Sequence, residues 1–503
     1  MHNRRYDLRA FVKHHPGGAQ AIGLGRGRNC TELFESYHSL TDVGKVRRTL
    51  ERYYVGDARE GDADYDNTFA WDRTPFYDEL KRRVRDYFRR AGRSHKAGWE
   101  QWAHLLLGCA LLLVAYPLLL RGWWVAVLLA PLGQAIGPEF LLHDGKHFAL
   151  SKHPWVNFLV SYAGFLHMSP FVWDHQHTIG HHMYTGVVGA DPDIYHFTVG
   201  NRLFKTGDSY VGVPGFRVGE VQRKPHEPIG AAHSWKLGFA VRMALAAAGP
   251  SILEDLLSFL PRQVVWGAGG VGEHGAFIGV VPFSEISRAR RAAHLVGRAL
   301  VMLLCVWWPF ASVLLWGSGG LHPLLRLAKA ATFATAPWML YGCIYYLQTQ
   351  ASHLQEEHFE AVGEAEGYPT IKKEWAAHQV EHTQDYCTTS ALWAHLVGGL
   401  NNQIVHHLFP HIAWQHYRHL APIVEATCAE FGVNYIKHPT FAAAFGKHLR
   451  YIWKVNASQT VTVPPQRKTT VDGLVFLGEV PWGRKAKREW EALHSRRAST
   501  KTD

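Results

Sequence analysis

Residues 173–186 read WDHQHTIGHHMYTG, and four histidines fall within eight positions of this stretch: His175, His177, His181 and His182. Residues i and i+4 share one face of an α-helix, so we expect His177 and His181 to point at one place, with His182 beside them. Neutral imidazole is the commonest side-chain ligand for metals. The stretch therefore predicts a metal site, although a solvated histidine-rich turn is an alternative for this stretch taken alone.

Histidines also gather elsewhere in the chain, which weakens that alternative. HDGKH places His143 and His147 at the same i, i+4 spacing, QIVHHLFPH supplies His406 and His407, and TQASH brings His353. A structural zinc takes four ligands, whereas this larger set suits two redox metals, and imidazole accepts iron. A histidine-rich di-iron centre beside lipid could activate dioxygen and remove hydrogen from an unactivated alkyl chain, which acid–base groups alone could not do.

The composition favours a membrane protein that handles metal. The 503 residues include 33 histidines and 19 tryptophans, and the formal charge is +11. Such a charge suits nucleic acid or an anionic membrane surface, but long apolar spans favour the membrane, so we expect no nucleic-acid partner. The six cysteines form no CxxC pair, and the opening MHNRRYDLRAF lacks the apolar region of a secretory signal.

Four apolar stretches predict a mainly α, polytopic integral membrane protein. Ala103–Leu120 and Gly122–Leu142 form one predicted hairpin, and Ala299–Gly317 and Ala330–Leu347 form a second. About four transmembrane helices would then leave all the large histidine-bearing segments on one face. The basic loop at residues 196–294 assigns that face to the cytosol.

The first 57 residues carry a second pattern of paired histidines. His15 precedes the turn Pro16-Gly17-Gly18, and His38 ends the segment ELFESYH. Two histidines on opposite walls of a small pocket could clamp a haem iron, although HPGG could also be an ordinary loop. The arrangement resembles the cytochrome b5 family, which implies that His15 and His38 hold haem b. That family normally has a further strand and helix before YDL, so we expect the module to be N-terminally incomplete.

The order HxxxH, HxxxHH and QxxHH resembles the three histidine boxes of the membrane fatty acid desaturases. Together with the cytochrome b5-like module, the Gln of the third box is similar to the front-end subgroup, which inserts a double bond between an existing one and the carboxyl end. The resemblance covers about residues 6–57 and 100–440.

This resemblance implies a set of metal ligands. Gln403 stands where other desaturases have a histidine, whereas His378, His382, His175 and His411 match no ligand position. The implied ligands are His143, His147, His177, His181, His182, His353, Gln403, His406 and His407.

The third box departs from the usual QIEHH, because Val405 replaces the Glu. Such a Glu could orient a neighbouring imidazole and Val cannot, so we expect either that another group orients the ring or that the site tolerates the absence of the Glu. On this basis Val405→Glu would change activity by no more than about an order of magnitude.

The resemblance implies a front-end desaturase that introduces a cis double bond into a polyunsaturated fatty acyl chain, with a delta-5-like pattern. Delta-4 and delta-6 specificity stay open, as do a fatty acyl or sphingolipid hydroxylase and an inactive or electron-carrying scaffold. The implied cofactors are two Fe ions and haem b. The implied partners are an acyl-lipid or acyl-CoA substrate, O2, NADH-cytochrome b5 reductase and membrane lipid, at the endoplasmic reticulum with the boxes on the cytosolic face.

The predicted domain organisation has four parts. Residues 1–57 form the cytochrome b5-like domain, residues 58–100 a linker with an amphipathic helix near Pro75–Arg90, residues 101–450 the desaturase domain, and residues 451–503 a basic tail. The amphipathic helix could lie on the membrane or be a plain solvated helix.

Overall fold

The computed structural model describes residues 1–59, 65–66, 68–166, 170–186, 191, 219–222, 288–353, 363–365, 368–371, 373–457 and 460–463. Helices dominate these residues, which confirms the predicted mainly α class. Most of the basic loop at residues 196–294 lies outside the described residues, and so does the predicted tail from residue 464 on.

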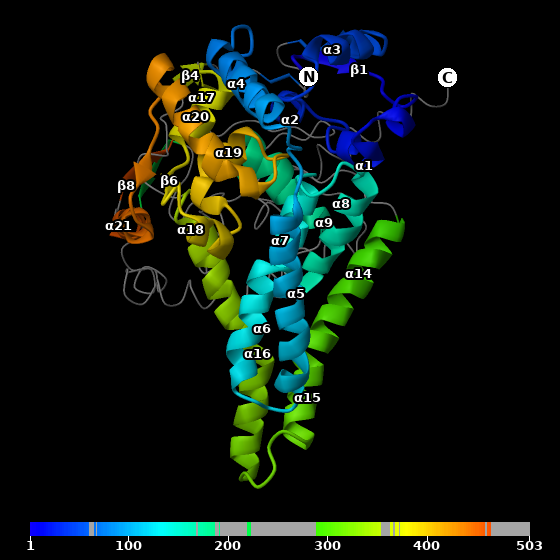
Figure 1. Ribbon diagram of the computed structural model, residues 1–503, viewed down its shortest axis with the longest axis vertical. Helices are drawn as coiled ribbons and strands as arrows, with labels where there is room; N and C mark the ends of the chain where they lie inside the picture. The colour runs from blue at the N-terminus through cyan, green and yellow to red at the C-terminus, as the bar shows by residue number, and fades with distance from the viewer. Residues whose placement is uncertain are drawn as a thin grey trace.

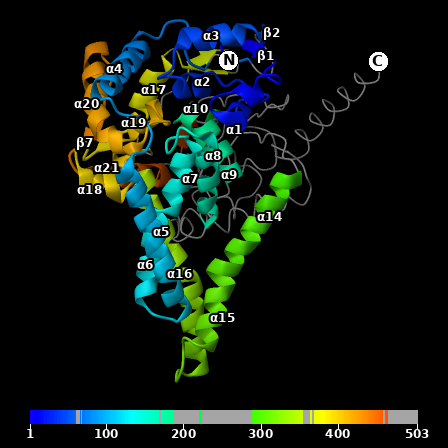
Figure 2. The ribbon, with the colours of Figure 1, turned by 45° about the vertical axis from the view of Figure 1, so that its right-hand side comes forward.

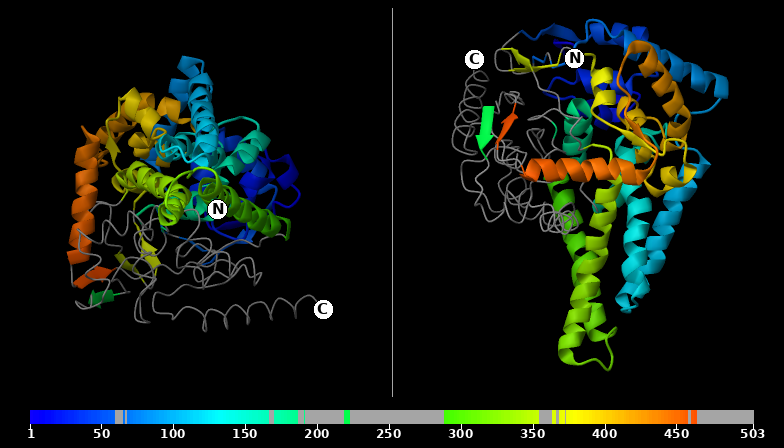
Figure 3. Two further views of the ribbon diagram at one scale, coloured as in Figure 1. Left: turned by 90° about the horizontal axis from the view of Figure 1, so that it is seen from below. Right: turned by 90° about the vertical axis from the view of Figure 1, so that its left-hand side faces the viewer.

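Two helical hairpins project in the same direction from the rest of the molecule (Figures 1 and 3). The first hairpin consists of α5 (Trp99–Leu120) and α6 (Val125–Ile136), and α7 (Pro138–Lys146) continues from α6. The second follows α14 (Arg288–Met302) and a π-helical segment (Leu303–Trp307), and consists of α15 (Trp308–Leu315) and α16 (Pro323–Gln350).

Glycines let the backbones of α5 and α6 approach closely. A Cβ atom on Gly108 would lie 2.4 Å from the backbone nitrogen of Gly137, and one on Gly133 would lie 2.6 Å from that of Leu112. Small residues at a helix contact are typical of helix pairs in membranes, where close backbone packing replaces the hydrophobic driving force.

Within the described residues, two helical stretches are long and apolar enough to cross a membrane, namely Trp99–Leu120 and Val125–Lys146, and Ala299–Leu315 is a shorter apolar stretch. Large apolar side chains point outward from both hairpins, including Leu113 at 74% and Trp316 at 71% exposure. A surface of this kind suits lipid rather than water.

The remaining helices form a head above the hairpins. It contains α17 (Trp375–Glu381), α18 (Ala391–Leu396), α19 (Gln403–Leu408), α20 (Tyr417–Phe431) and α21 (Phe441–Ala457). Short strands pair within and beside it: β4 (Gly363–Ala365) antiparallel to β5 (Tyr368–Thr370), β6 (Asp385–Tyr386) parallel to β7 (Lys437–His438), and β3 (Gly219–Gln222) antiparallel to β8 (Thr460–Val463).

The amphipathic helix α4 (Pro75–Ala91) belongs to this head, and its apolar face is covered by protein. Tyr77, Leu80 and Val84 are fully buried in the largest apolar cluster, which also contains residues of α19 and α20. Both alternatives suggested by the sequence are therefore wrong for this helix, because its apolar stripe packs against α20 instead of facing lipid or water.

The N-terminal module lies against the same head (Figure 2). Strand β1 (Arg4–Tyr6) pairs antiparallel with β2 (Tyr54–Asp57), and the chain between them forms α1 (Gly18–Gly23), α2 (Thr31–Tyr37) and α3 (Val43–Glu51). Gly18 has φ +84°, and a Cβ on it would come 2.9 Å from the Pro154 side chain of α8 (Pro154–Ser161). Glycine is thus required both for the turn and for the close approach between the module and α8.

Candidate functional site

A first group of four buried histidines comes from three separate segments. His143 and His147 stand at the end of α7, His177 lies in the segment after α9 (Pro170–Trp173), and His406 lies on α19. One nitrogen of each ring lies within 4.8 Å of the others. The geometry therefore allows all four rings to face one metal ion.

A second group lies beside the first. It consists of His181, His353 and His407, which likewise offer nitrogen atoms within 4.8 Å of one another. His353 follows α16 directly, as the sequence predicted, so the end of the second hairpin delivers a histidine to the head.

His182 lies between the two groups. Its ring centroid is 4.5 Å from that of His147 in the first group and 4.4 Å from that of His407 in the second. Its Nε2 lies 3.1 Å from Nε2 of His177. All eight histidines implied as ligands are thus brought together.

The central histidine stretch forms a π-helix (Asp174–His181), not the expected α-helix, and α10 (His182–Tyr184) follows it. The backbone N–H of His182 donates to the carbonyl of His177, five residues earlier, as a π-helix requires. This winding places His177 and His182 together. The rings of His177 and His181 remain neighbours at 5.4 Å but join different groups, so the prediction that they point at one place is wrong.

In each group one ring is held by a buried carboxylate. Nδ1–H of His143 donates to Oδ1 of Asp144 at 2.8 Å, and Nδ1–H of His181 donates to Oδ1 of Asp191 at 3.0 Å. A carboxylate acceptor fixes the tautomer with the proton on Nδ1, so that the Nε2 lone pair is available to a metal.

Neutral side chains hold three further rings in the same way. Nδ1 of His147 lies 2.7 Å from Oη of Tyr37, and Nδ1 of His406 lies 3.1 Å from Oη of Tyr417. Nδ1 of His407 lies 2.9 Å from Oε1 of Gln379 and 3.0 Å from Oγ1 of Thr185. These partners orient rings that would otherwise rotate.

The opposite nitrogens fit a metal. Nε2 of His143, His147, His406 and His407 is buried and has no hydrogen-bond partner among the described residues. Burial lowers the pKa of His147, His406 and His407 well below its usual value, so these rings are neutral. Buried polar atoms are costly when unsatisfied, and neutral imidazole is the form that binds metal.

Gln403 lies beside the second group, where its Nε2 donates to Nε2 of His353 at 2.8 Å. His378 and His382 lie outside both groups, as the sequence suggested, with their rings stacked at 3.6 Å. His378 donates from Nε2 to the carbonyl of Thr185 at 2.7 Å, so it supports the segment that follows the central stretch.

The N-terminal module presents its two histidines to each other. The ring centroids of His15 and His38 are 6.1 Å apart, close to the roughly 6 Å expected when two imidazole nitrogens each lie about 2 Å from one iron. His15 donates from Nδ1 to the Gly18 carbonyl at 3.3 Å, and His38 donates from Nδ1 to the Phe34 carbonyl at 2.9 Å. A Cβ on Gly17 would come 2.9 Å from Cε1 of His15, so HPGG leaves room for this ring.

The partners of the ligand rings are the residues that sequence reasoning missed. Asp144 and Asp191 carried a weak signal, since both are acidic residues near a histidine box. Tyr37 and Gln379 carried none, because each lies in a segment far from the box that it supports, and a tyrosine 11 positions after His406 has no pattern that marks Tyr417 as a partner.

Comparisons with known proteins agree with this geometry. Residues 121–439 match the family model described as fatty acid desaturase, and residues 1–59 match the cytochrome b5-like heme/steroid binding domain. The second match implies haem binding at the module that carries His15 and His38.

Three relatives span nearly the whole chain. A probable Delta(5) fatty acid desaturase C of Dictyostelium discoideum is 28% identical, over 93% of this chain and 92% of its own. An acyl-lipid (8-3)-desaturase of Mortierella alpina is 29% identical over 90% and 92%, and an acyl-lipid omega-13 desaturase of Chlamydomonas reinhardtii is 27% identical over 92% and 94%. Because the desaturase model matches more than half of the chain, the chain belongs to the fatty acid desaturase family, whose members are oxidoreductases, and it carries a fused cytochrome b5-like domain.

Proposed function

We propose that this protein is a front-end desaturase that introduces a cis double bond, at the delta-5 position, into a polyunsaturated fatty acyl chain. The observation that carries the proposal is the pair of buried histidine groups with His182 between them. Relatives named Delta(5) and (8-3) desaturases support the position of the new bond, whereas the omega-13 relative shows that proteins of this likeness differ in regioselectivity.

Two iron ions fit the two groups. Redox metals that accept imidazole suit a site with seven grouped histidines and an eighth between them. Bound iron would supply the reductive activation of O2 that hydrogen removal from an alkyl chain needs. The protein holds the rings in fixed tautomers through Asp144 and Asp191, and excludes water by burying them. We also propose Gln403 as a ligand of the second iron, because its side-chain amide lies beside His353, 2.8 Å from Nε2 of that ring.

The hairpins would place this site at the membrane surface. We propose four crossings by the two hairpins, with the head on the cytosolic face of the endoplasmic reticulum. Both hairpins project from one side of the head (Figure 3). Both also expose large apolar side chains. An acyl chain embedded in lipid would then reach the histidines from the hairpin side, whether it is carried by a phospholipid or by coenzyme A.

The N-terminal module would deliver the electrons. Haem b between His15 and His38 would be reduced by NADH-cytochrome b5 reductase and would pass electrons to the iron site. The facing rings at 6.1 Å and the space left by Gly17 support haem binding.

Expression in yeast fed with candidate polyunsaturated acids, followed by gas chromatography of the lipids, tests the function. The expected product carries one additional double bond at the delta-5 position. A hydroxylated product would overturn the desaturase assignment, and a new bond at another position would overturn only the regioselectivity. Iron analysis of the active protein should find about two atoms per chain.

A further inference from the structure

One hydrogen bond joins the two histidine sites of the molecule directly. Tyr37 is the last residue of α2 and the chain neighbour of His38 in the N-terminal module. Its Oη lies 2.7 Å from Nδ1 of His147, a member of the first histidine group. The two residues are 110 positions apart in the chain, so only the docking of the module brings them together.

Three other rings surround the Tyr37 ring. It lies nearly parallel to the His147 ring, at 6.4 Å and 22°, and meets the Phe148 ring edge-on at 5.9 Å. The His411 ring is 6.1 Å away on another side. His411 therefore packs beside Tyr37 and belongs to neither histidine group.

Phe148 adopts an unusual backbone conformation beside the Tyr37 ring. Its φ is +57°, a region that is costly for a bulky residue unless the surroundings impose it. The carbonyl of Phe148 accepts a hydrogen bond from Nζ of Lys96 at 2.7 Å, and the same Nζ donates to the carbonyl of His411 at 3.3 Å. Lys96 therefore ties together two of the residues that surround Tyr37.

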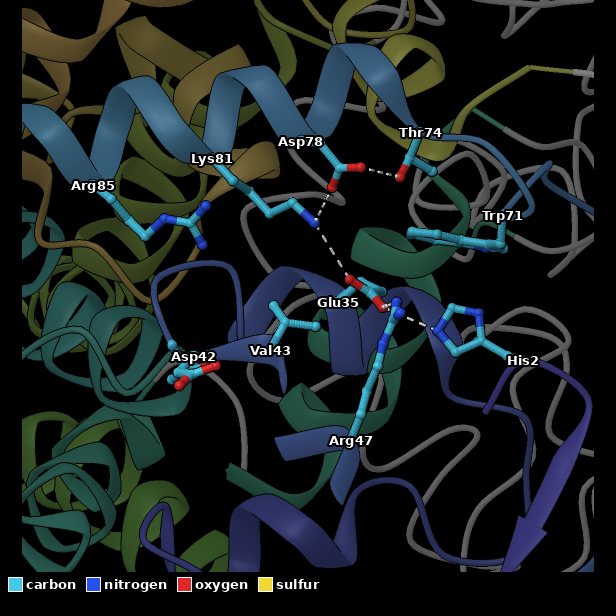
Figure 4. A pocket seen from close by; sticks show the side chains of 11 residues that line it. His2, Glu35, Asp42, Val43, Arg47, Trp71, Thr74, Asp78, Lys81 and Arg85 are labelled. Atoms are coloured by element: carbon cyan, nitrogen blue, oxygen red, sulfur yellow. Dashed lines mark hydrogen bonds and ion pairs between the residues drawn. The ribbon is translucent and has the colours of Figure 1, made fainter. Parts of the chain in front are cut away.

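Helix α2 is also held from its other side. Glu35 lies 3.0 Å from Nε2 of His2 and 3.5 Å from Nζ of Lys81 on α4, at the edge of a cavity of about 430 Å³ (Figure 4). Lys81 lies in turn 3.0 Å from Asp78. These contacts and the approach of Gly18 to Pro154 limit movement of the helix that carries Tyr37.

We infer that Tyr37 is the electron bridge from the haem to the metal site, an inference that rests on the proposed function. The path runs from His38 through the adjoining backbone to Tyr37, and across its hydroxyl to the His147 ring. With haem held by His15 and His38 and iron held by the first group, one electron would pass from haem iron(II) to iron(III) of the first group, so that one iron is oxidised as the other is reduced. Tyr37 and His147 keep their protons and their oxidation states, because they supply only the bonded route.

The test removes one tyrosine hydroxyl group in each of two variants. Tyr37→Phe and Tyr417→Phe each remove the hydroxyl that holds a ligand ring of the first group, but only Tyr37 is also the chain neighbour of the haem ligand His38. The full-length protein is purified with haem and iron, reduced, and mixed with O2 and acyl substrate. The loss of the reduced-haem absorbance is followed by stopped flow, and direct oxidation by O2 is subtracted with haem-loaded protein prepared without iron.

Tyr37→Phe is expected to reoxidise its haem severalfold more slowly than Tyr417→Phe when the two are compared at equal haem and iron content, because both lose an outer partner of a ligand ring but only Tyr37→Phe also loses the route. Tyr417→Phe loses the support of His406 but keeps the bonded route from the haem ligand, so it is expected to slow reoxidation less than Tyr37→Phe does. Reoxidation of Tyr37→Phe at the wild-type rate would overturn the inference. Equal slowing in both variants would also overturn it, since Tyr37 would then only orient a ligand. If the wild type holds no iron or forms no double bond, the proposed function itself fails.

Discussion

The haem pocket and the metal centre both use histidines, but they hold them by different means. His15 and His38 donate from Nδ1 to backbone carbonyls within four residues of themselves. His147, His406 and His407 are held by side chains from other segments of the chain. A backbone acceptor is available wherever the chain turns, whereas a side-chain acceptor must be brought in by the fold. The ring orientations in the haem pocket therefore depend on local backbone structure, whereas those in the metal centre depend on how the whole head packs.

The largest expected effect follows from removing a ring of the metal centre. His181→Ala should abolish desaturation and lower the iron content from about two atoms per chain, because His181 is one of only three rings in the second group. The haem absorbance should not change, since neither haem ligand contacts this group. Product analysis and metal analysis measure the two effects. His175→Ala is the matched control, in the same stretch but outside both groups, and loss of iron from it alone would contradict the assignment.

The second effect follows from removing a ring of the haem pocket, and it should leave the metal centre intact. His15→Ala should remove the reduced-haem absorbance and most of the desaturation, while the iron content stays unchanged, because the metal groups contain no residue of the module. His14→Ala, at the neighbouring exposed position, should keep both properties. Full activity of a haem-free His15→Ala protein would show that electrons reach the metal from a separate carrier.

The third effect concerns the apolar support of the metal centre. Val405 is fully buried in the largest apolar cluster, next to His406. Burial changes the expectation from sequence, since Val405→Glu would place an unpaired carboxylate among apolar side chains and cost about 3–5 kcal/mol of stability. Thermal unfolding measures this loss, and Val405→Thr, which keeps the shape without the charge, should cost less. Wild-type stability of Val405→Glu would mean that a partner for the carboxylate exists.

The smallest effect concerns the contact between the module and the head. Burial would raise the pKa of Glu35, but its hydrogen bond to His2 and the charges of Lys81 and Arg47 lower it below the usual 4.5. A lowered pKa contributes stability that is present above about pH 4.5 and is lost as the pH falls through the folded value. Lys81→Met should therefore lower the free energy of unfolding near neutral pH, by less than the roughly 3–5 kcal/mol that breaking an isolated buried pair costs, because His2 and Arg47 remain.

In Lys81→Met, the loss of stability in acid should also be smaller and be complete at a higher pH, because the folded pKa of Glu35 moves back toward its usual value when one lowering charge is gone. The pH dependence of the thermal midpoint measures both effects. Lys45→Met removes the same charge from an exposed position of α3 and should shift neither. An unchanged pH profile for Lys81→Met would show that Lys81 does not support Glu35.

The sequence by itself determined which histidines gather in the head. The i, i+4 spacing of His143 and His147, the paired His406 and His407, and His353 at the end of an apolar stretch identified rings that the structure brings together. It also determined the helical class and the facing of His15 and His38, because hydropathy and HPGG are local signals.

Only the tertiary structure decided how the rings are divided and held. The π-helical winding that sends His177 and His181 to different groups is imposed by packing, not by local preference. The apolar face of α4 likewise carried no information about whether it would meet lipid, water or α20. Tyr37 became a partner of His147 only through docking of the module, because a contact across 110 residues depends on how the whole chain packs, which no local pattern encodes.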